Sequence, residues 1–280
     1  MSHEARFHLA GLMGFPVMHS RSPLIHGHWM REHGLTGAYV PLAVPPQGLE
    51  AALRGLPALG FAGINLTIPH KEEALRIVDE VSPLAKRIGA VNCIVVRADG
   101  SLEGRNYDAF GFIESLREGS RGFDFKKAPA VVMGAGGASR AVLAGLMDEG
   151  VPEIRLINRS PQRAEALAAE FGGAVRAVKW EERSAALGGA GLLVNTTSQG
   201  MQGQAPLDLK LDDLPKEALV TDIVYVPLET PLLRDARLRG NATVDGLGML
   251  LHQARPAFED WFGVKVAVTP ALRREIEATL

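Results

Sequence analysis

Short apolar runs alternate with stretches of helical periodicity along the N-terminal part of the chain. Runs typical of buried strands cover residues 7–12, 38–44, 60–66 and 93–96. Apolar side chains at helical spacing cover residues 23–33, 47–56 and 71–78. A short apolar run indicates a buried strand, and an apolar stripe with a period of about 3.6 residues indicates an amphipathic helix. The N-terminal part therefore reads as a βα alternation.

The alternation restarts after a charged, turn-rich stretch at residues 118–127. Further strands are predicted at residues 130–133, 153–158, 174–178, 191–195 and 219–223. Two helical stretches, 246–262 and 270–280, follow the last strand and are compatible with packing on either half. Alternation of this kind predicts an α/β fold with mostly parallel sheets covered by helices on both faces.

Length and composition narrow the class of protein. The 280 residues suit two domains, since domains commonly hold about 100–150 residues each. With 30 basic and 32 acidic residues the net charge is −2, which favours a small-molecule partner over nucleic acid or an anionic membrane. Cys93 is the only cysteine, which excludes an intrachain disulfide, and residues 1–10 lack the features of a signal peptide. We therefore expect a cytoplasmic protein; a homodimer is compatible with the sequence but not indicated by it.

The turn after the strand at 130–133 has the composition of a phosphate-binding loop. Its sequence, Gly134-Ala135-Gly136-Gly137-Ala138-Ser139, leads into an amphipathic stretch at 141–147. Such a turn places backbone N–H groups and the positive end of a helix against a pyrophosphate. Taken alone the pattern is weak, because many small-residue turns bind nothing. The candidate cofactor-binding residues here are Gly134, Gly136, Gly137 and Ala138.

The end of the next strand indicates which dinucleotide is bound. A carboxylate there accepts from a free ribose 2′-hydroxyl, whereas an arginine pairs with a 2′-phosphate. This chain has Asn158-Arg159-Ser160, with Arg163 one turn later, and so favours NADP(H). The alternative is a solvated pair of surface arginines. Further candidates for lining the cofactor are the strand end Asn195-Thr196-Thr197-Ser198, above all Thr196, and also Gly246 and Met249.

Two serines, Ser20 and Ser22, stand where the first predicted helix begins, just before Pro23. Two hydroxyls beside the free N–H groups of a helix N-terminus suit a carboxylate ligand. The alternative is that Ser22 is only the N-cap of a helix with Pro23 at its first position.

A second polar cluster, Asn65, Thr67 and Lys71, ends the strand at 60–66, where ligands gather in open α/β sheets. Lys71 is a candidate proton donor to a carbonyl that is being reduced, although most lysines at helix starts are solvated. His70 is either a second acid or an exposed helix residue. Asp108 begins a helical pattern, so it is either an N-cap or the partner of Lys71. The spacing of histidines, carboxylates and the single cysteine matches no metal site, and we expect none.

In this order, the motifs resemble those of the shikimate dehydrogenase family. The matching runs span nearly the whole chain, and although each is weak the ordered set is specific. They are Gly14-x-Pro16-x-x-His19-Ser20-x-Ser22-Pro23, Asn65-x-Thr67-x-Pro69-x-Lys71, Gly89-Ala90-Val91-Asn92, Asn106-x-Asp108-x-x-Gly111, Gly134-Ala135-Gly136-Gly137-Ala138, Asn158-Arg159, Asp222-x-x-Tyr225-x-Pro227-x-x-Thr230-Pro231-Leu232, and Gly246-x-Gly248-Met249-Leu250 with Gln253.

The resemblance implies reversible, NADPH-dependent reduction of 3-dehydroshikimate to shikimate, in the pathway to aromatic amino acids. It implies that Lys71 is the acid/base group, with Asp108 orienting it. The residues that it implies for substrate binding are Ser20 and Ser22 for the carboxylate, Thr67, Asn92, Asp108 and Gln253 for the hydroxyls, and Tyr225 nearby. The implied fold has a substrate domain (1–108 plus 246–280) and a Rossmann-type NADP-binding domain (109–245). The C-terminal helices return to the substrate domain, and the active site lies between the domains.

Three positions depart from the family pattern without removing a catalytic group. They are Tyr107 in place of Thr, Leu66 in place of Val, and Ser139 in place of Ala. Ser22 favours shikimate over quinate, because quinate-using relatives often carry Thr there. Two alternatives stay open. One is an NAD-using quinate/shikimate dehydrogenase paralogue, which Asn158-Arg159 disfavours; the other is a non-catalytic ligand-binding relative, which the intact Lys71 and Asp108 disfavour.

Overall fold

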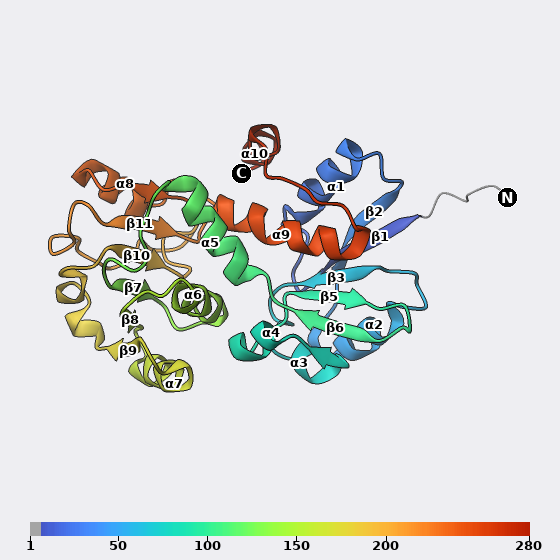
Figure 1. The fold of residues 1–280 in the computed structure, drawn as a ribbon, viewed down its shortest axis with the longest axis horizontal. Helices are drawn as coiled ribbons and strands as arrows, with labels where there is room; N and C mark the ends of the chain where they lie inside the picture. Colours follow the sequence, from blue (N-terminus) through green and yellow to red (C-terminus); the bar gives the residue numbers. More distant parts are fainter. Residues whose placement is uncertain (1–6) are drawn as a thin grey trace. The chain divides into compact units, whose positions relative to one another are not determined.

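The chain, seen here as a computed structural model, is described over residues 7–280, so most of the N-terminal stretch assessed for a signal peptide lies outside the described residues (Figure 1). Its internal contacts divide it into two compact units. Unit 1 comprises the chain up to Tyr107 together with Gln253–Thr279, and unit 2 comprises Asp108–His252 with the terminal Leu280. The family resemblance implies a return to the substrate domain at residue 246, whereas the internal contacts divide the chain at Gln253, inside helix α9 (Leu247–Phe262).

Unit 1 contains a six-stranded sheet with the order β2-β1-β3-β5-β6-β4. Its strands are β1 (His8–Gly14), β2 (Gly37–Ala43), β3 (Gly63–Leu66), β4 (Glu80–Val81), β5 (Cys93–Val96) and β6 (Leu102–Arg105). β1 is parallel to β2 and β3, as expected, but β5 is antiparallel to both of its neighbours. β5 departs from the parallel order because a tight turn joins it to β6, closed by the Arg97 N–H donating to the Ser101 carbonyl at 2.9 Å.

Helices cover both faces of the unit 1 sheet (Figure 1). Those of this unit are α1 (Ser22–Glu32), the 3-10 turn η1 (Pro46–Gly48), α2 (Leu49–Gly55), α3 (Ala74–Ile77), α4 (Pro83–Ile88), the C-terminal part of α9, and α10 (Pro270–Glu277). Leu53 of α2, Ile77 of α3 and Ala85 of α4 share one core with Ile64 and Ile94 of the sheet. α1 and α9 contribute to a second, aromatic core, and the Trp261 indole donates to the Ile94 carbonyl at 3.0 Å.

The aromatic core of unit 1 encloses a histidine. His26 of α1 is fully buried and stacks on Tyr39, with ring centroids 4.1 Å apart. Trp29 and Phe258 also contact its ring. Burial lowers the pKa of His26 from 6.5 to about 3, although the nearby Asn65 amide acts in the opposite direction. His26 is therefore neutral in the folded protein at neutral pH.

We expect His26 to make the protein acid-sensitive. Its folded pKa lies below its unfolded value, so the unfolded chain binds the extra proton, and the stability is lost as pH falls from 6.5 towards 3. Between pH 7 and pH 5 the wild type should lose about 2 kcal/mol more of its free energy of unfolding than His26→Phe, which keeps a ring but cannot titrate. Urea unfolding of both proteins at the two pH values measures this difference, and equal losses would show that His26 does not titrate as described.

Unit 2 is a doubly wound sheet with all strands parallel and the order β12-β11-β10-β7-β8-β9. Its strands are β7 (Ala130–Met133), β8 (Ile154–Ile157), β9 (Val175–Val178), β10 (Leu192–Asn195), β11 (Leu219–Asp222) and β12 (Thr243–Val244). Its helices are α5 (Asp108–Gly119), α6 (Gly137–Asp148), α7 (Pro161–Phe171) and α8 (Pro231–Arg239), with 3-10 turns η2 (Trp180–Glu182) and η3 (Ala185–Leu187) and the first residues of α9. This order has its switch point between β7 and β10, the arrangement of dinucleotide-binding folds.

Alternate residues of the unit 2 strands pack into two different hydrophobic cores, one on each face of the sheet. Ala130 and Val132 of β7 pack with Leu116 and Leu143 from α5 and α6, and Val131 packs on the opposite face with Leu233 of α8. A strand buried on both faces needs apolar residues at every position, which is why β7 reads as one continuous apolar run. The sheet is thereby fixed between two helical layers, with its carboxyl edge free to carry a site.

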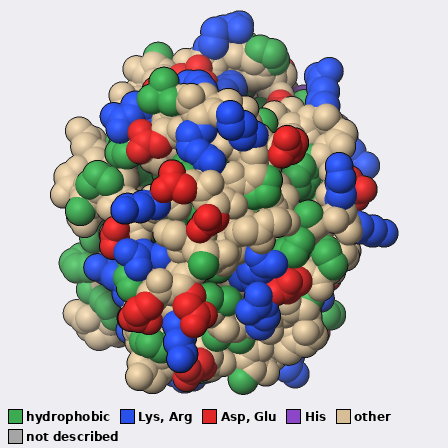
Figure 2. Space-filling model, turned by 90° about the vertical axis from the view of Figure 1, so that its left-hand side faces the viewer, with side chains coloured by type: hydrophobic (Ala, Val, Ile, Leu, Met, Phe, Trp, Pro, Cys, Tyr) green, Lys and Arg blue, Asp and Glu red, His purple; other side chains and the backbone are tan. Residues whose placement is uncertain are grey.

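The exposed face in Figure 2 carries Lys and Arg side chains intermixed with Asp and Glu. Neither sign gathers into one patch on this face, so it offers no single-sign field to steer a polyanion.

Across residues 7–280, no helix combines the length and the apolar run that crossing a bilayer requires.

Candidate active site

The two serines before α1 bond to each other. The Ser22 N–H donates to Ser20 Oγ at 3.2 Å, and the Ser20 hydroxyl donates to Ser22 Oγ at 3.3 Å. Ser22 is the first residue of α1 rather than its N-cap; the N-cap is Arg21, which makes no side-chain capping bond, and the expectation of Pro23 at the first position is off by one. The Arg21 guanidinium instead donates to the carbonyls of His19 and Thr279. The two serine hydroxyls thus lie at the start of α1, and neither serine is its N-cap.

Close backbone approach brings the end of β1 against the end of β3. A Cβ added to Gly14 would lie 2.3 Å from Thr67 Cγ2, so a larger residue at this position would displace the Thr67 side chain. The Phe15 N–H donates to the Ile68 carbonyl at 3.1 Å and the Thr67 N–H to the Met13 carbonyl at 3.0 Å. The loop leading to Ser20 and the segment of Thr67 therefore start from the ends of the paired strands β1 and β3.

Lys71 lies in a half-buried turn after β3, not in a helix. The helix expected from residue 71 begins only at Ala74. The reason is that the Lys71 carbonyl accepts from the Val91 N–H at 2.7 Å, which takes it out of a helical ladder. His70 is not the exposed helix residue that was one of its two expected roles. It is buried, with Nε2 2.8 Å from the Val44 carbonyl, and this contact anchors the turn that carries Lys71.

A buried amide network positions Asn92 just before β5. The Tyr39 hydroxyl donates to Asn65 Oδ1 at 2.8 Å, and Asn65 Nδ2 donates to the Asn92 carbonyl at 3.1 Å. Asn92 Nδ2 in turn donates to Gln253 Oε1 of α9 at 3.4 Å. Of the predicted substrate residues, the structure thus joins Asn92 and Gln253 directly, through side chains that are far apart in sequence.

Two of the predicted catalytic and substrate-binding residues belong to unit 2. Asp108 is the buried first residue of α5 and is peptide-bonded to Tyr107 of unit 1. Tyr225 follows β11 and is half-buried. The adjacent Asp222 has a pKa raised by burial, while its carboxylate accepts from Asn195 at 3.0–3.1 Å and from the Thr230 hydroxyl at 2.8 Å. Asp222 therefore fixes the strand end that precedes Tyr225.

The glycine turn after β7 exposes its backbone. The N-cap of α6 is Gly136, with no side-chain cap bond, so the first N–H groups of the helix have no capping side chain. A Cβ added to Gly136 or Gly137 would meet nothing within 4 Å, which leaves space beside the turn. Ala138 continues the first turn of α6, and the Ser139 hydroxyl donates to the Gly136 carbonyl at 2.6 Å. Ser139 is therefore accommodated where the family pattern has Ala.

A pocket of about 260 Å³ lies at the carboxyl edge of the unit 2 sheet, at the switch point. Arg159 and Arg163 line it and are exposed, and within residues 7–280 neither makes an ion pair. The residues that line it are Gly134, Ala135, Gly136, Asn158, Arg159, Arg163, Trp180, Thr196, Thr197, Ser198 and Gln199. Open N–H groups and two unpaired guanidiniums suit a phosphorylated dinucleotide, so this donor set fits NADP(H).

Thr196 and Asn158 shape this pocket as well as lining it. The Thr196 hydroxyl donates to the Met133 carbonyl at 2.7 Å, which ties the end of β10 to the end of β7. Asn158 Nδ2 donates to the Ser160 carbonyl at 3.0 Å and holds the loop that carries Arg159. Gly246 and Met249 are not among the lining residues: Gly246 passes against the Ile223 carbonyl, and Met249 packs on the α5 side of the sheet.

Two lining residues escaped the sequence analysis, Trp180 and Gln199. Trp180 follows the end of β9, and the Arg183 guanidinium lies 4.6 Å from its ring centroid. Its position after a strand of the parallel sheet was the available signal. In the described part of the chain, no three His, Cys, Asp or Glu side chains group as a metal site would require.

Comparison with known families matches both units. Residues 12–94 match the family described as "Shikimate dehydrogenase substrate binding domain", and residues 117–206 match "Shikimate / quinate 5-dehydrogenase". A curated relative from Paramagnetospirillum magneticum, "Shikimate dehydrogenase (NADP(+))", is 59% identical over 273 residues, which cover 98% of each chain.

Solved structures of shikimate and quinate dehydrogenases are also similar to this chain. Shikimate 5-dehydrogenase from Thermus thermophilus, in complex with NADP(H) and shikimate, is 40% identical, with a TM-score of 0.87 over 98% of this chain and 100% of the other. Quinate dehydrogenase from Corynebacterium glutamicum, in complex with NAD, is 33% identical, with a TM-score of 0.91 over 97% of this chain and 99% of the other. The similarity thus extends over both units and is not confined to one motif.

Proposed function

The chain belongs to the shikimate dehydrogenase family, and we propose that Lys71 and Asp108 carry its catalytic chemistry. The reaction is the reversible, NADP-dependent interconversion of 3-dehydroshikimate and shikimate. The observation that supports it most is the 59% identity to a "Shikimate dehydrogenase (NADP(+))" that extends over 98% of both chains. The unpaired arginines at the unit 2 pocket agree with the cofactor in that name.

The substrate residues are assigned by what each side chain can offer. Ser20 and Ser22 are proposed to donate their hydroxyls to the substrate carboxylate, beside the N-terminus of α1. Thr67, Asn92 and Gln253 are proposed to bind the ring hydroxyls, and Tyr225 to contact the substrate from unit 2. A site of this kind rejects analogues that lack a hydroxyl, because its buried amides would then be left unpaired.

Lys71 is proposed as the proton donor during reduction. NADPH, when bound, supplies the hydride that adds to the carbonyl carbon of 3-dehydroshikimate. The Lys71 ammonium gives its proton to the carbonyl oxygen, which becomes the hydroxyl of shikimate, and the neutral amine then recovers a proton from water. In the reverse direction, the neutral Lys71 amine accepts the hydroxyl proton. Asp108 is proposed as the second catalytic group, a carboxylate that orients the ammonium.

The cofactor residues are proposed from the unit 2 pocket. The turn would receive the pyrophosphate on the backbone N–H groups of Gly136, Gly137 and Ala138, and Arg159 with Arg163 would pair with the 2′-phosphate. Gly134 would line the turn without donating, because its N–H bonds to the Ile157 carbonyl at 2.7 Å. Asn158 and Thr196, which line the pocket, are also proposed to contact the cofactor. Ser160, Gly246 and Met249 do not line it, and their proposed roles rest on the sequence alone.

A substrate panel tests this function. Shikimate, quinate and aminoshikimate are each oxidised by the purified protein with NADP⁺ and with NAD⁺, and initial rates are compared. We expect the highest kcat/KM for shikimate with NADP⁺. Faster turnover of quinate with NAD⁺ would identify the paralogue, and binding of shikimate without turnover by either cofactor would identify a non-catalytic relative.

The remaining expectations concern context. We propose that the reaction takes place in the cytoplasm, where the buried thiol of Cys93 would stay reduced. A homodimer is the association that we propose to test first. Sedimentation in the assay buffer at enzyme concentrations that bracket those of the assay distinguishes it from a monomer.

A further inference from the structure

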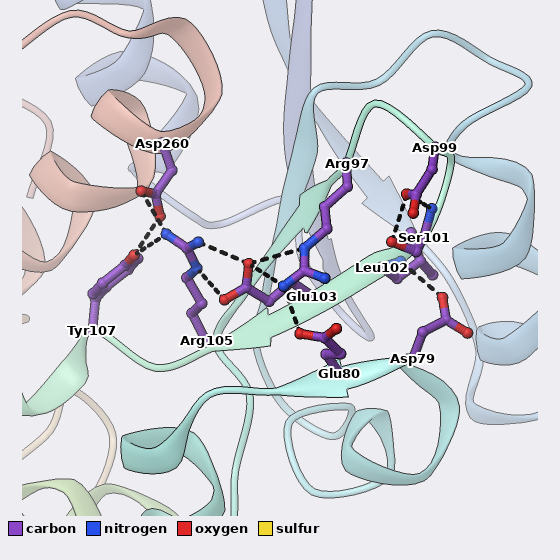
Figure 3. Close-up of polar contacts among 10 residues, drawn as sticks. All are labelled: Asp79, Glu80, Arg97, Asp99, Ser101, Leu102, Glu103, Arg105, Tyr107 and Asp260. Carbon is purple, nitrogen blue, oxygen red and sulfur yellow. Dashed lines mark hydrogen bonds and ion pairs between the residues drawn. The ribbon is translucent and has the colours of Figure 1, made fainter.

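Tyr107 stands where the family pattern has Thr, and its side chain has two polar partners. Its hydroxyl donates to Asp260 of α9, and Arg105 Nη1 donates to the hydroxyl oxygen at 3.3 Å (Figure 3). Arg105 also pairs with Asp260 at 2.7 Å. The hydroxyl, the guanidinium and the carboxylate thus form a closed triangle of polar contacts between the end of β6 and α9. We call Tyr107, Arg105 and Asp260 the β6–α9 clamp.

The clamp is held from its far side by a chain of ion pairs. Arg105 donates through Nε and Nη2 to the two oxygens of Glu103, at 2.9 and 2.8 Å. Glu103 also pairs with Arg97, whose guanidinium reaches the exposed Glu80 (Figure 3). A guanidinium that bonds carboxylates on both sides has little freedom to rotate. Burial raises the pKa of the Tyr107 hydroxyl, so it stays protonated and remains a donor to Asp260.

The backbone of Tyr107 determines how Asn92 is oriented. The Tyr107 N–H donates to Asn92 Oδ1 at 2.9 Å. A backbone N–H can only donate, so this bond requires the oxygen of the Asn92 amide on the Tyr107 side. The Nδ2 group must then face the other way, where it lies 3.4 Å from Gln253 Oε1. Asn92 therefore offers a donor, not an acceptor, on the Gln253 side.

Helix α9 is contacted at two points of the same face. Gln253 meets Asn92 and Asp260 meets the clamp, and the two residues are seven positions apart. Seven positions are close to two helical turns, or about 10 Å along the axis, so both side chains leave the helix on one side. Both residues belong to one continuous helix, although Pro256 between them removes one bond of the helical ladder, so a shift at Asp260 would move the segment that carries Gln253.

We propose that Tyr107 is a positioning residue for substrate binding: through the β6–α9 clamp it fixes the donor side of Asn92 and its distance from Gln253. This inference rests on the proposed roles of Asn92 and Gln253. The hydroxyl of Tyr107 bonds to Asp260 and Arg105, so Tyr107 acts through Asn92 and not as a contact to substrate. The Thr of the family pattern is too short to reach Asp260, so this chain replaces a small side chain by a tethered one.

The test compares Tyr107→Phe and Asp260→Ala with the wild type in steady-state kinetics. Both variants should raise KM for shikimate by about 3- to 10-fold, with kcat changed less than about 2-fold and KM for NADP⁺ unchanged, because substrate positioning is loosened while the reacting groups remain. The double variant should be no worse than Asp260→Ala alone, since both changes remove the bond between the Tyr107 hydroxyl and Asp260. Glu259→Ala is the matched control: it removes an exposed carboxylate from the neighbouring position of α9, where Glu259 lies 3.8 Å from Lys265 and outside the clamp, and it should leave all constants unchanged.

Other results would contradict the positioning role of Tyr107 or identify a different cause. If Tyr107→Phe raises KM but Asp260→Ala does not, the hydroxyl contacts substrate directly and the positioning role is overturned. Wild-type constants in both variants, or an equal rise in KM for NADP⁺, overturn it as well. Thermal unfolding of each variant identifies a general loss of fold. Failure of the wild type to oxidise shikimate would instead refute the proposed function, whatever the variants do.

Discussion

Lys71→Ala is expected to lower kcat for shikimate oxidation by about 10²–10⁴-fold, the usual contribution of a positioned general acid or base. The dissociation constant for shikimate, measured by equilibrium titration, should change by less than about 3-fold. The serines and amides, which bind the substrate equally in the ground state and the transition state, are retained. A loss of this kind is the signature of a group that acts in the transition state. It would be seen in both directions, since one group donates the proton in reduction and accepts it in oxidation.

Lys86→Ala is the control for this prediction. Lys86 is an exposed lysine of α4 in the same unit, and its removal changes the net charge equally. Its kcat should match the wild type. Retention of more than about a tenth of kcat in Lys71→Ala would remove Lys71 from the role of proton donor, on the scale of general acid–base effects. Asp108→Asn should also lower kcat, because the amide carries no charge to orient the ammonium.

The strands of unit 2 could be predicted closely because they are buried on both faces. The expected strand at 130–133 coincides with β7, and those at 191–195 and 219–223 extend one residue beyond β10 and β11. β6 could not be recognised, since Leu102-Glu103-Gly104-Arg105 holds a single large apolar residue. β4 and β12 have two residues each, too few for any periodicity to appear.

The candidate site could be predicted residue by residue but not as a set of contacts. Strand ends drew attention to Thr67, Lys71 and Arg159, because ligands gather at the carboxyl edge of parallel sheets. The bond from the Tyr107 N–H to Asn92 depends on the antiparallel register that pairs Cys93 with Arg105. Nothing local in the sequence specifies that register. Trp180 escaped for the same kind of reason, since it reaches the pocket only through the order of strands in the sheet.

Arg159→Ala is expected to raise KM for NADPH by about 10- to 100-fold while changing KM for NADH by less than about 2-fold. The 2′-phosphate is the only group that distinguishes the two cofactors. NADH lacks this phosphate, so it cannot form the charge-assisted bond that Arg159 is expected to make with NADPH. A factor of ten corresponds to about 1.4 kcal/mol, so the expected range matches the loss of one charged hydrogen-bonding partner at a partly solvated site. Arg176→Ala, which removes an exposed arginine paired with Glu153, should leave both constants unchanged.

Arg163 makes the prediction sharper, because it lines the same pocket. If the two guanidiniums share one phosphate, Arg163→Ala should give a smaller rise in KM for NADPH, and the double variant should use NADPH and NADH about equally. A rise in salt concentration should weaken NADPH binding in the wild type and have little effect in the double variant, since screening acts on the charge pair that has been removed. An equal rise in KM for NADPH and NADH in Arg159→Ala would indicate that the arginine binds the pyrophosphate, which both cofactors carry. Arg159 would then not be the residue that selects NADP.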